Sequence, residues 1–81
     1  MTKDVRGIIR DFVLKYVKDD ELGDDENMFE LGYVNSLFAM QLVMFVEKEF
    51  ALTISRENLT LTNFQSIDAI VALVEGEGHG N

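Results

Sequence analysis

The sequence predicts an all-α protein: a small bundle of three main helices plus one short helix, with a long loop after the first helix. Three observations support this prediction. Apolar residues recur at spacings of three and four in three separate segments, which is the period of a helix buried on one face. No segment alternates convincingly between apolar and polar residues as a half-buried strand does. The chain also contains no proline, so nothing of that kind interrupts a helix.

The first helix is predicted over residues 3–18, with Thr2 as its N-cap. Its apolar stripe consists of Val5, Ile8, Ile9, Phe12, Val13, Tyr16 and Val17. A basic amphipathic helix of this kind is also found on membrane surfaces. In a domain this small, however, an apolar stripe is needed for the core, and we expect this one to be buried there.

Residues 19–34 form a long loop that holds seven of the 15 acidic residues. Apolar residues within the loop are expected to pin it to the core: Leu22, Met28, Phe29 and Leu31. The clustered carboxylates raise the possibility of a calcium loop. Counting from Asp19 places Glu30 at the last position of an EF-hand loop, but Asp24 stands where the turn needs glycine. We therefore predict a solvated acidic loop and no metal site.

The second helix is predicted over residues 36–50, with Asn35 as its N-cap. Its core face consists of Ala39, Leu42, Val43, Val46 and Phe50. A surplus of apolar residues lies elsewhere around this helix: Leu37, Phe38, Met40, Met44 and Phe45. Either the long loop or a partner protein must cover this surplus.

A short helical segment is predicted at residues 56–61. A polar cluster from Thr62 to Ser66 is expected to start the last helix, whose apolar residues are Phe64, Ile67, Ile70, Val71 and Val74. The domain is expected to span residues 1–75, and the glycine-rich tail, residues 76–81, to be disordered. One core should unite the elements, made of Phe12, Phe29, Leu42, Val46, Phe50, Ile54, Phe64, Ile67 and Val71.

Composition excludes several classes of function. A chain of 81 residues forms one domain, too small for a deep active-site cleft, and it has no cysteine. Its one histidine, His79, lies in the glycine-rich tail, and Ser36 is not part of a Gly-x-Ser-x-Gly turn, so we predict no catalytic residue and no enzyme. No apolar run approaches the roughly 20 residues that span a bilayer, and we expect a cytoplasmic protein without membrane contact.

The net charge of −8 is unevenly distributed along the chain. Five basic and two acidic residues give the first 18 positions a charge of +3, whereas two basic and 13 acidic residues give the remainder −11. An acidic surface of this size repels phosphate backbones and anionic lipids. It favours partner proteins with basic patches, and nucleic acid is not expected as a ligand.

Residues 28–54, "MFELGYVNSLFAMQLVMFVEKEFALTI", resemble the core signature of acyl and peptidyl carrier proteins. The shared elements, in order, are "FELG", the tripeptide Asn35-Ser36-Leu37, the stretch "VEKEF", and Ile54 four places further on. The resemblance extends over nearly the whole chain, since the first helix, the acidic loop and the closing helix also fit. It is specific because several elements agree in order and spacing.

This resemblance implies that Ser36 receives a covalent phosphopantetheine from coenzyme A, and that the thiol of this arm holds the cargo as a thioester. The position suits a phosphodiester, because a helix start offers unpaired N–H groups and the positive end of the helix dipole. Asn35 would be the helix N-cap beside the attachment point. The arm would also supply the thiol that a chain without cysteine lacks.

The chain departs from the family pattern at several positions. Asn35 replaces the usual aspartate, and Phe38, Gln41 and Lys48 stand where fatty-acid carriers are often acidic. The docking face should therefore be more apolar and less charged; we expect it to include Leu37, Phe38, Gln41, Met44, Glu47 and Lys48. An alternative for Phe38 is that the loop covers it through Met28 or Leu31.

The segment "NSLFAMQLV" most resembles the corresponding segment of stand-alone carriers of polyketide and nonribosomal peptide pathways, including those that build substituted malonyl extender units. The partners implied are a phosphopantetheinyl transferase, a loading enzyme (an acyltransferase or an adenylating enzyme), and downstream synthase or tailoring enzymes. We expect the carrier itself to be a monomer. The alternative function is a helical protein–protein interaction module without a prosthetic group. The sequence does not identify the cargo.

Overall fold

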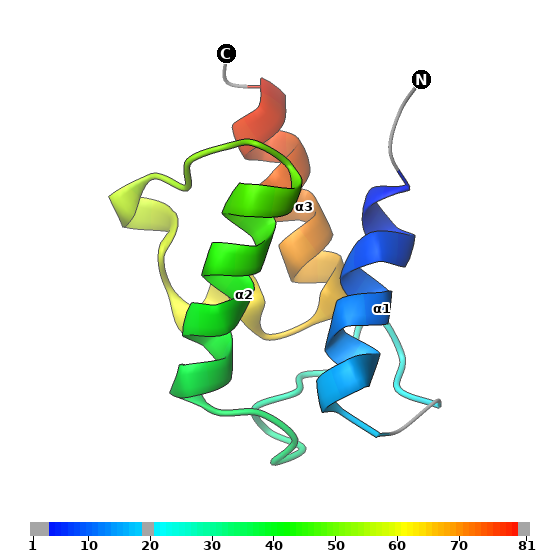
Figure 1. Ribbon diagram of the computed structural model, residues 1–81. Helices are drawn as coiled ribbons and strands as arrows, with labels where there is room; N and C mark the ends of the chain where they lie inside the picture. The colour runs from blue at the N-terminus through cyan, green and yellow to red at the C-terminus, as the bar shows by residue number, and fades with distance from the viewer. Residues whose placement is uncertain (1–3, 19–20, 80–81) are drawn as a thin grey trace.

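The computed structural model describes residues 4–18 and 21–79. Within them lie three helices, α1 (Val5–Tyr16), α2 (Ser36–Glu49) and α3 (Ile67–His79), two short 3₁₀ turns, η1 (Arg56–Asn58) and η2 (Leu61–Phe64), and no strand (Figure 1). The predicted all-α bundle with a long loop is confirmed. The short helix expected at residues 56–61 is replaced by the two 3₁₀ turns. The described part of the chain therefore forms a bundle of three α-helices and not of four. A segment this short lacks the length that makes an α-helical turn cooperative.

Helix α1 begins at Val5, and Asp4 is its N-cap, with the side chain accepting a hydrogen bond from the Gly7 N–H at 3.1 Å. The prediction of a helix start at residue 3 with Thr2 as the cap was wrong about the cap, and Thr2 itself lies outside the described residues. Gly7 explains the choice, because a Cβ at this position would overlap the Asp4 carboxylate. The helix ends at Tyr16, two residues before the predicted end.

The core contains apolar residues from all three helices and from the loops between them. Of the predicted members, these are buried: Leu42, Val46, Ile54, Phe64, Ile67 and Val71. The other three predicted members, Phe12, Phe29 and Phe50, pack against this cluster but stay partly exposed, as does Val43. The helical phasing predicted for α2 is therefore confirmed at Leu42 and Val46.

The long loop between α1 and α2 is anchored by Leu22 and Met28, which are buried as predicted. Leu31 is not an anchor, because 45% of it is exposed. The reason is a local turn: the Leu31 N–H donates to the Asn27 carbonyl at 3.1 Å, and Gly32 follows with a positive φ of 78°. Leu31 therefore lies on the outer side of a chain reversal that only glycine adopts easily.

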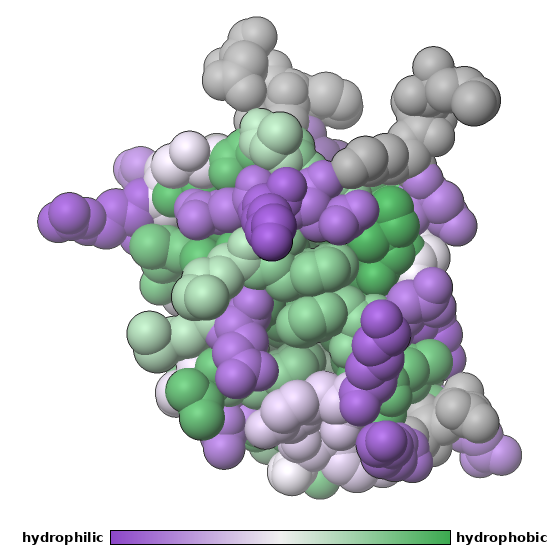
Figure 2. All heavy atoms as spheres, viewed as in Figure 1, coloured by the Kyte–Doolittle hydropathy of each residue, from purple (hydrophilic) through white to green (hydrophobic). Residues whose placement is uncertain are grey.

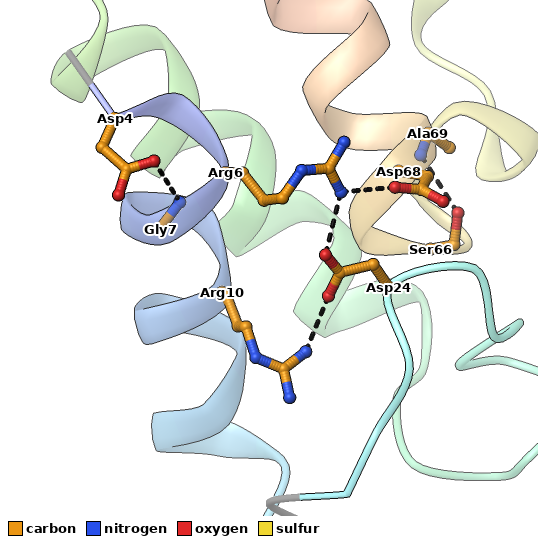
Figure 3. Close-up of polar contacts among 8 residues, drawn as sticks. All are labelled: Asp4, Arg6, Gly7, Arg10, Asp24, Ser66, Asp68 and Ala69. Carbon is orange, nitrogen blue, oxygen red and sulfur yellow. Dashed lines mark hydrogen bonds and ion pairs between the residues drawn. The ribbon is translucent and has the colours of Figure 1, made fainter.

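Four charged residues fasten this loop to α1 and α3, and we call them the polar clamp: Arg6, Arg10, Asp24 and Asp68. The Asp24 carboxylate accepts from Arg10 at 2.7 Å and from Arg6 at 2.9 Å, and Arg6 also binds Asp68 (Figure 3). The Asp68 N–H donates to the Asp24 carbonyl at 2.8 Å. Asp24, expected as one of several solvated acids, thus has a structural role.

Two hydrogen bonds raise the pKa of Arg6 above its ordinary value: the one to Asp68 has the larger effect, and the one to Asp24 the next largest.

A second connection between the loop and the start of α3 lies at Gln65, whose carbonyl accepts from the Met28 N–H at 2.7 Å. The Gln65 side chain accepts from Asn27 at 3.2 Å. The loop is therefore held by its backbone as well as by ion pairs.

Helix α3 continues to His79, so the domain boundary predicted at residue 75 falls inside a helix. Residues 76–79, expected to belong to a disordered tail, are helical, and residues 80–81 lie outside the described part. The helix extends because each added residue gains one hydrogen bond on a turn already fixed by the buried Val71 and Val74. In the described residues, no helix combines the length and apolar character needed to cross a membrane.

Candidate functional site

Ser36 is the first residue of α2 and is exposed. Asn35 precedes it in an extended conformation, and the Asn35 Oδ1 accepts a hydrogen bond from the Phe38 N–H at 3.1 Å. The predicted N-cap is confirmed. The Asn35 carbonyl also accepts the first hydrogen bond of the helix, from Ala39 at 3.1 Å. The cap therefore fixes where α2 begins, and it holds the Ser36 hydroxyl at the positive end of the helix dipole.

An apolar groove of about 350 Å³ begins beside Ser36, and we call it the Ser36 groove. One wall is α2, and the other is the segment 59–64, which contains η2. Its lining consists of Ser36, Ala39, Met40, Val43, Met44, Leu59, Thr60, Leu61 and Phe64. Figure 2 shows hydrophobic side chains gathered over much of this view of the molecule. A group attached to Ser36 would thus start at the end of an apolar channel.

The outward face of α2 is mostly apolar. Leu37, Met40 and Met44 are exposed to 62%, 64% and 67%, and Gln41 and Lys48 are also exposed. Residues of this size on one helix face form a patch of the kind that contacts other proteins. The structure therefore leaves Leu37, Gln41, Met44 and Lys48 accessible to a partner.

Glu47 belongs to the predicted docking face, but its side chain is half-buried and forms a hydrogen bond within the protein. Its Oε2 accepts from the Ile54 N–H at 3.0 Å. This bond ties the end of α2 to the segment that follows. Glu47 therefore has a structural role that its sequence position did not indicate.

Phe38 is fully buried, so its prediction as an exposed docking residue was wrong. The centroid of its ring lies 4.2 Å from that of Tyr16 and 6.0 Å from that of Phe12. Phe12 in turn stacks on Phe45, with 4.1 Å between the ring centroids. We call these four side chains the aromatic column. Rings from α1 lie against Phe38, and Met28, one of the two loop residues expected to cover it, belongs to the same buried cluster. The sequence contained the signal, because Phe38 precedes Leu42 by four residues and so shares the core stripe.

The model of one protein family, the phosphopantetheine attachment site, matches residues 3–74 of this chain. The chain belongs to this family. The matched region includes all of α1 and α2, the Ser36 groove, and α3 as far as Val74. A search among curated proteins found no match.

Members of the phosphopantetheine attachment family are non-catalytic carriers, and the domain is the place where the phosphopantetheine arm is covalently attached. The chain is therefore a carrier protein and not an enzyme. Carrier domains of this family interact with the enzymes that modify them and with synthases. The predicted cofactor and the carrier assignment are thus confirmed.

Three features of the structure were not predicted from the sequence: the polar clamp, the contact of α1 rings with Phe38, and the groove. The groove depends on segment 59–64 lying against α2, which no local pattern specifies. The available signal for the groove was the pair Leu59 and Leu61, two apolar residues on either side of Thr60 and shortly before the buried Phe64.

Proposed function

We propose that Ser36 carries the phosphopantetheine arm and that the protein holds acyl or aminoacyl intermediates as thioesters on it. The observation that supports this most strongly is that Ser36 combines an exposed hydroxyl with the capped start of a helix inside the family-matched region. A phosphodiester formed there lies beside the first-turn N–H groups, which favour an anion.

The other two serines are less suitable for attachment. Ser66 is buried, and its Oγ accepts from the Ala69 N–H at 3.0 Å at the start of α3. Ser55 is half-buried and precedes the 3₁₀ turn η1. Neither begins a long helix with an exposed hydroxyl, so a transferase would reach Ser36 more easily than either.

We further propose a role in polyketide or nonribosomal peptide biosynthesis, with extender units as the cargo. The resemblance of "NSLFAMQLV" to stand-alone carriers of those pathways supports this, as does the nearly uncharged outward face of α2. The proposed partners are a phosphopantetheinyl transferase, an acyltransferase or adenylating enzyme that loads the arm, and downstream synthase or tailoring enzymes. A monomer suffices for this role, because one chain already forms a complete core.

The attachment site is tested by incubating the apo-protein with coenzyme A and a phosphopantetheinyl transferase of broad specificity, and by measuring the intact mass. We expect one phosphopantetheine per chain, mapped to Ser36 by peptide fragmentation. Ser36→Ala should fold normally, as judged by circular dichroism, and accept none. Ser55→Ala is the matched control and should accept one.

An unmodified wild-type chain beside a positive-control carrier would contradict the proposal and favour an interaction module without a prosthetic group. The pathway is tested separately, by mass spectrometry of thioesters on protein isolated from its producing cell. A substituted malonyl group on Ser36 would support the extender-unit role. A long saturated acyl chain would contradict it and leave the attachment site unaffected.

A further inference from the structure

Two of the four methionines stand out because they are apolar and yet largely exposed. Met40 and Met44 are 64% and 67% exposed, whereas Met28 is completely buried in the core. A thioether sulfur is oxidised by hydroperoxides to the extent that the oxidant reaches it. The described part of the chain therefore contains two susceptible methionines and one protected one.

Met40 and Met44 are also placed beside the attachment site. Ser36, Met40 and Met44 follow one another at intervals of four residues, so they lie along one stripe of α2. Both methionines line the Ser36 groove. Leu59 and Leu61 form part of the opposite wall and are about half exposed. The two sulfur atoms thus belong to the surface that surrounds Ser36.

We propose that Met40 and Met44 form an oxidation-sensitive pair that controls how well enzymes bind the α2 face beside Ser36. This inference rests on the proposed function of Ser36. In the reaction, the lone pair of each thioether sulfur attacks one oxygen of hydrogen peroxide and the O–O bond breaks. The proton of the transferred oxygen moves to the departing oxygen, which leaves as water. Each methionine is oxidised to a sulfoxide by one peroxide, which is reduced.

Oxidation changes the groove because a sulfoxide is polar and the lining offers it few partners. Ser36 and Thr60 supply the polar side chains of the lining, and the remainder is apolar. The sulfoxide oxygens must therefore keep bound water, which an enzyme has to remove before it can contact this face. An oxidised carrier should bind its modifying enzyme more weakly.

The fold should tolerate this change. Neither methionine belongs to the buried core, and both side chains point largely into solvent. Oxidation of Met28 would be different, because a polar group would then enter the core. The pair therefore alters the surface around Ser36 while α2 and its cap remain in place. Methionine sulfoxide reductases reverse the reaction, so the change is a switch rather than damage.

The test uses the full-length apo-protein, treated with hydrogen peroxide and then freed of it, so that neither coenzyme A nor the transferase meets the oxidant. Peptide mapping should find sulfoxide at Met40 and Met44 and intact Met28. The rate of phosphopantetheine transfer to Ser36 at subsaturating carrier should fall by roughly threefold to tenfold, as expected for the loss of apolar contact by two side chains. Treatment with both classes of methionine sulfoxide reductase should restore the rate.

Two double variants separate the pair from other effects of peroxide. Met40→Leu/Met44→Leu keeps an apolar surface but has no thioether at either position, so its transfer rate, whatever its value before treatment, should be the same before and after peroxide. Met40→Gln/Met44→Gln imitates the polarity of the sulfoxides and should be slow without any peroxide. All melting temperatures should stay close to that of the untreated protein.

Equal transfer rates for treated and untreated wild type would overturn the inference and leave the attachment site standing. The same loss of rate in the Met40→Leu/Met44→Leu variant would also overturn it, because the effect would then arise elsewhere. Failure of the untreated wild type to accept any phosphopantetheine would overturn the proposed function together with this inference.

Discussion

Besides the apolar residues that it buries in the core, such as Ile9 and Val13, helix α1 forms two junctions of opposite chemistry. Toward the loop and α3 it presents Arg6 and Arg10, which form the polar clamp with Asp24 and Asp68 (Figure 3). Toward α2 it presents Phe12 and Tyr16, which form the aromatic column with Phe38 and Phe45. Each pair on α1 is spaced by four residues, so each lies on one face of the helix.

The two junctions differ in what can weaken them. The side chains of the clamp are 28–48% exposed, so water and salt screen its charges and each pair contributes little to stability. In the column, Phe38 is fully buried, and its contacts do not depend on charge. The comparison shows that the column stabilises the helix that carries Ser36, whereas the clamp positions the loop.

The largest effect is expected from breaking the core that both junctions share. Val46 is fully buried, so Val46→Asp places an unpaired carboxylate in the core and should unfold the domain, at a cost on the order of 4 kcal/mol or more. Thermal unfolding followed by circular dichroism measures this. Met44→Asp, two residues away on the exposed face, is the matched control and should remain folded. A cooperative transition at unchanged temperature for Val46→Asp would contradict the core assignment.

Breaking the aromatic column should cost somewhat less. Phe38→Ala leaves a cavity between α1 and α2 and should lower the free energy of unfolding by about 3–5 kcal/mol. Because the lost contacts are apolar, the loss should be nearly the same at low and high salt. Urea unfolding at two salt concentrations measures it, and Leu37→Ala, at an exposed neighbour, should be nearly neutral. A stability loss below about 1 kcal/mol would mean that Phe38 is not part of the core.

The two junctions also differ in how far the sequence predicts them. Asn35 and the stripe through Leu42 and Val46 gave the start and phase of α2 correctly, because capping and helical periodicity are local properties. The burial of Phe38 was accessible from the same stripe but was kept only as an alternative to exposure, since the surplus of apolar residues around α2 suggested a partner.

The polar clamp could not be predicted in this way. Its ion pairs join Arg6 to residues 18 and 62 positions away, and many other acids were equally available as partners. Only the packing of the loop against α1 and α3 selects Asp24 and Asp68. The extent of α3 was missed for a related reason, because glycine disfavours a helix locally while an adjoining packed helix can still extend through it.

Breaking the polar clamp should have a smaller effect that salt removes. Asp24→Asn loses the charge that Arg6 and Arg10 share, so the melting temperature should fall at low salt, and by less than for Phe38→Ala. At high salt the variant and the wild type should converge. Asp25→Asn, at the exposed neighbouring residue, is the control. A loss that is independent of salt would show that Asp24 acts through the geometry of its side-chain hydrogen bonds to Arg6 and Arg10 rather than through screened charge.

Mild alkali does not test the clamp through Arg6. The pKa of Arg6 is raised in the folded protein, so its contribution is fully present below the ordinary pKa of arginine. It is lost only as the pH rises through the still higher pKa of the folded state. Between pH 6 and about 10, stability should therefore show no decline that originates from Arg6, and salt remains the sharper test.

The smallest expected effect lies outside both junctions, at the end of α2. Ala51 has a positive φ of 52°, a left-handed conformation that glycine adopts without the steric cost of a Cβ. Ala51→Gly should therefore raise the free energy of unfolding, by roughly 0.5 kcal/mol after the greater flexibility of glycine in the unfolded chain is subtracted. The gain should be the same at low and high salt.

The gain should also add to the losses from Phe38→Ala and from Asp24→Asn, because Ala51 contacts neither junction through a described hydrogen bond, ion pair or ring. Urea unfolding of the single and double variants measures this. Destabilisation by Ala51→Gly would show that the methyl group packs usefully, and a gain that appears only at low salt would connect the end of α2 to the charged junction rather than to the backbone.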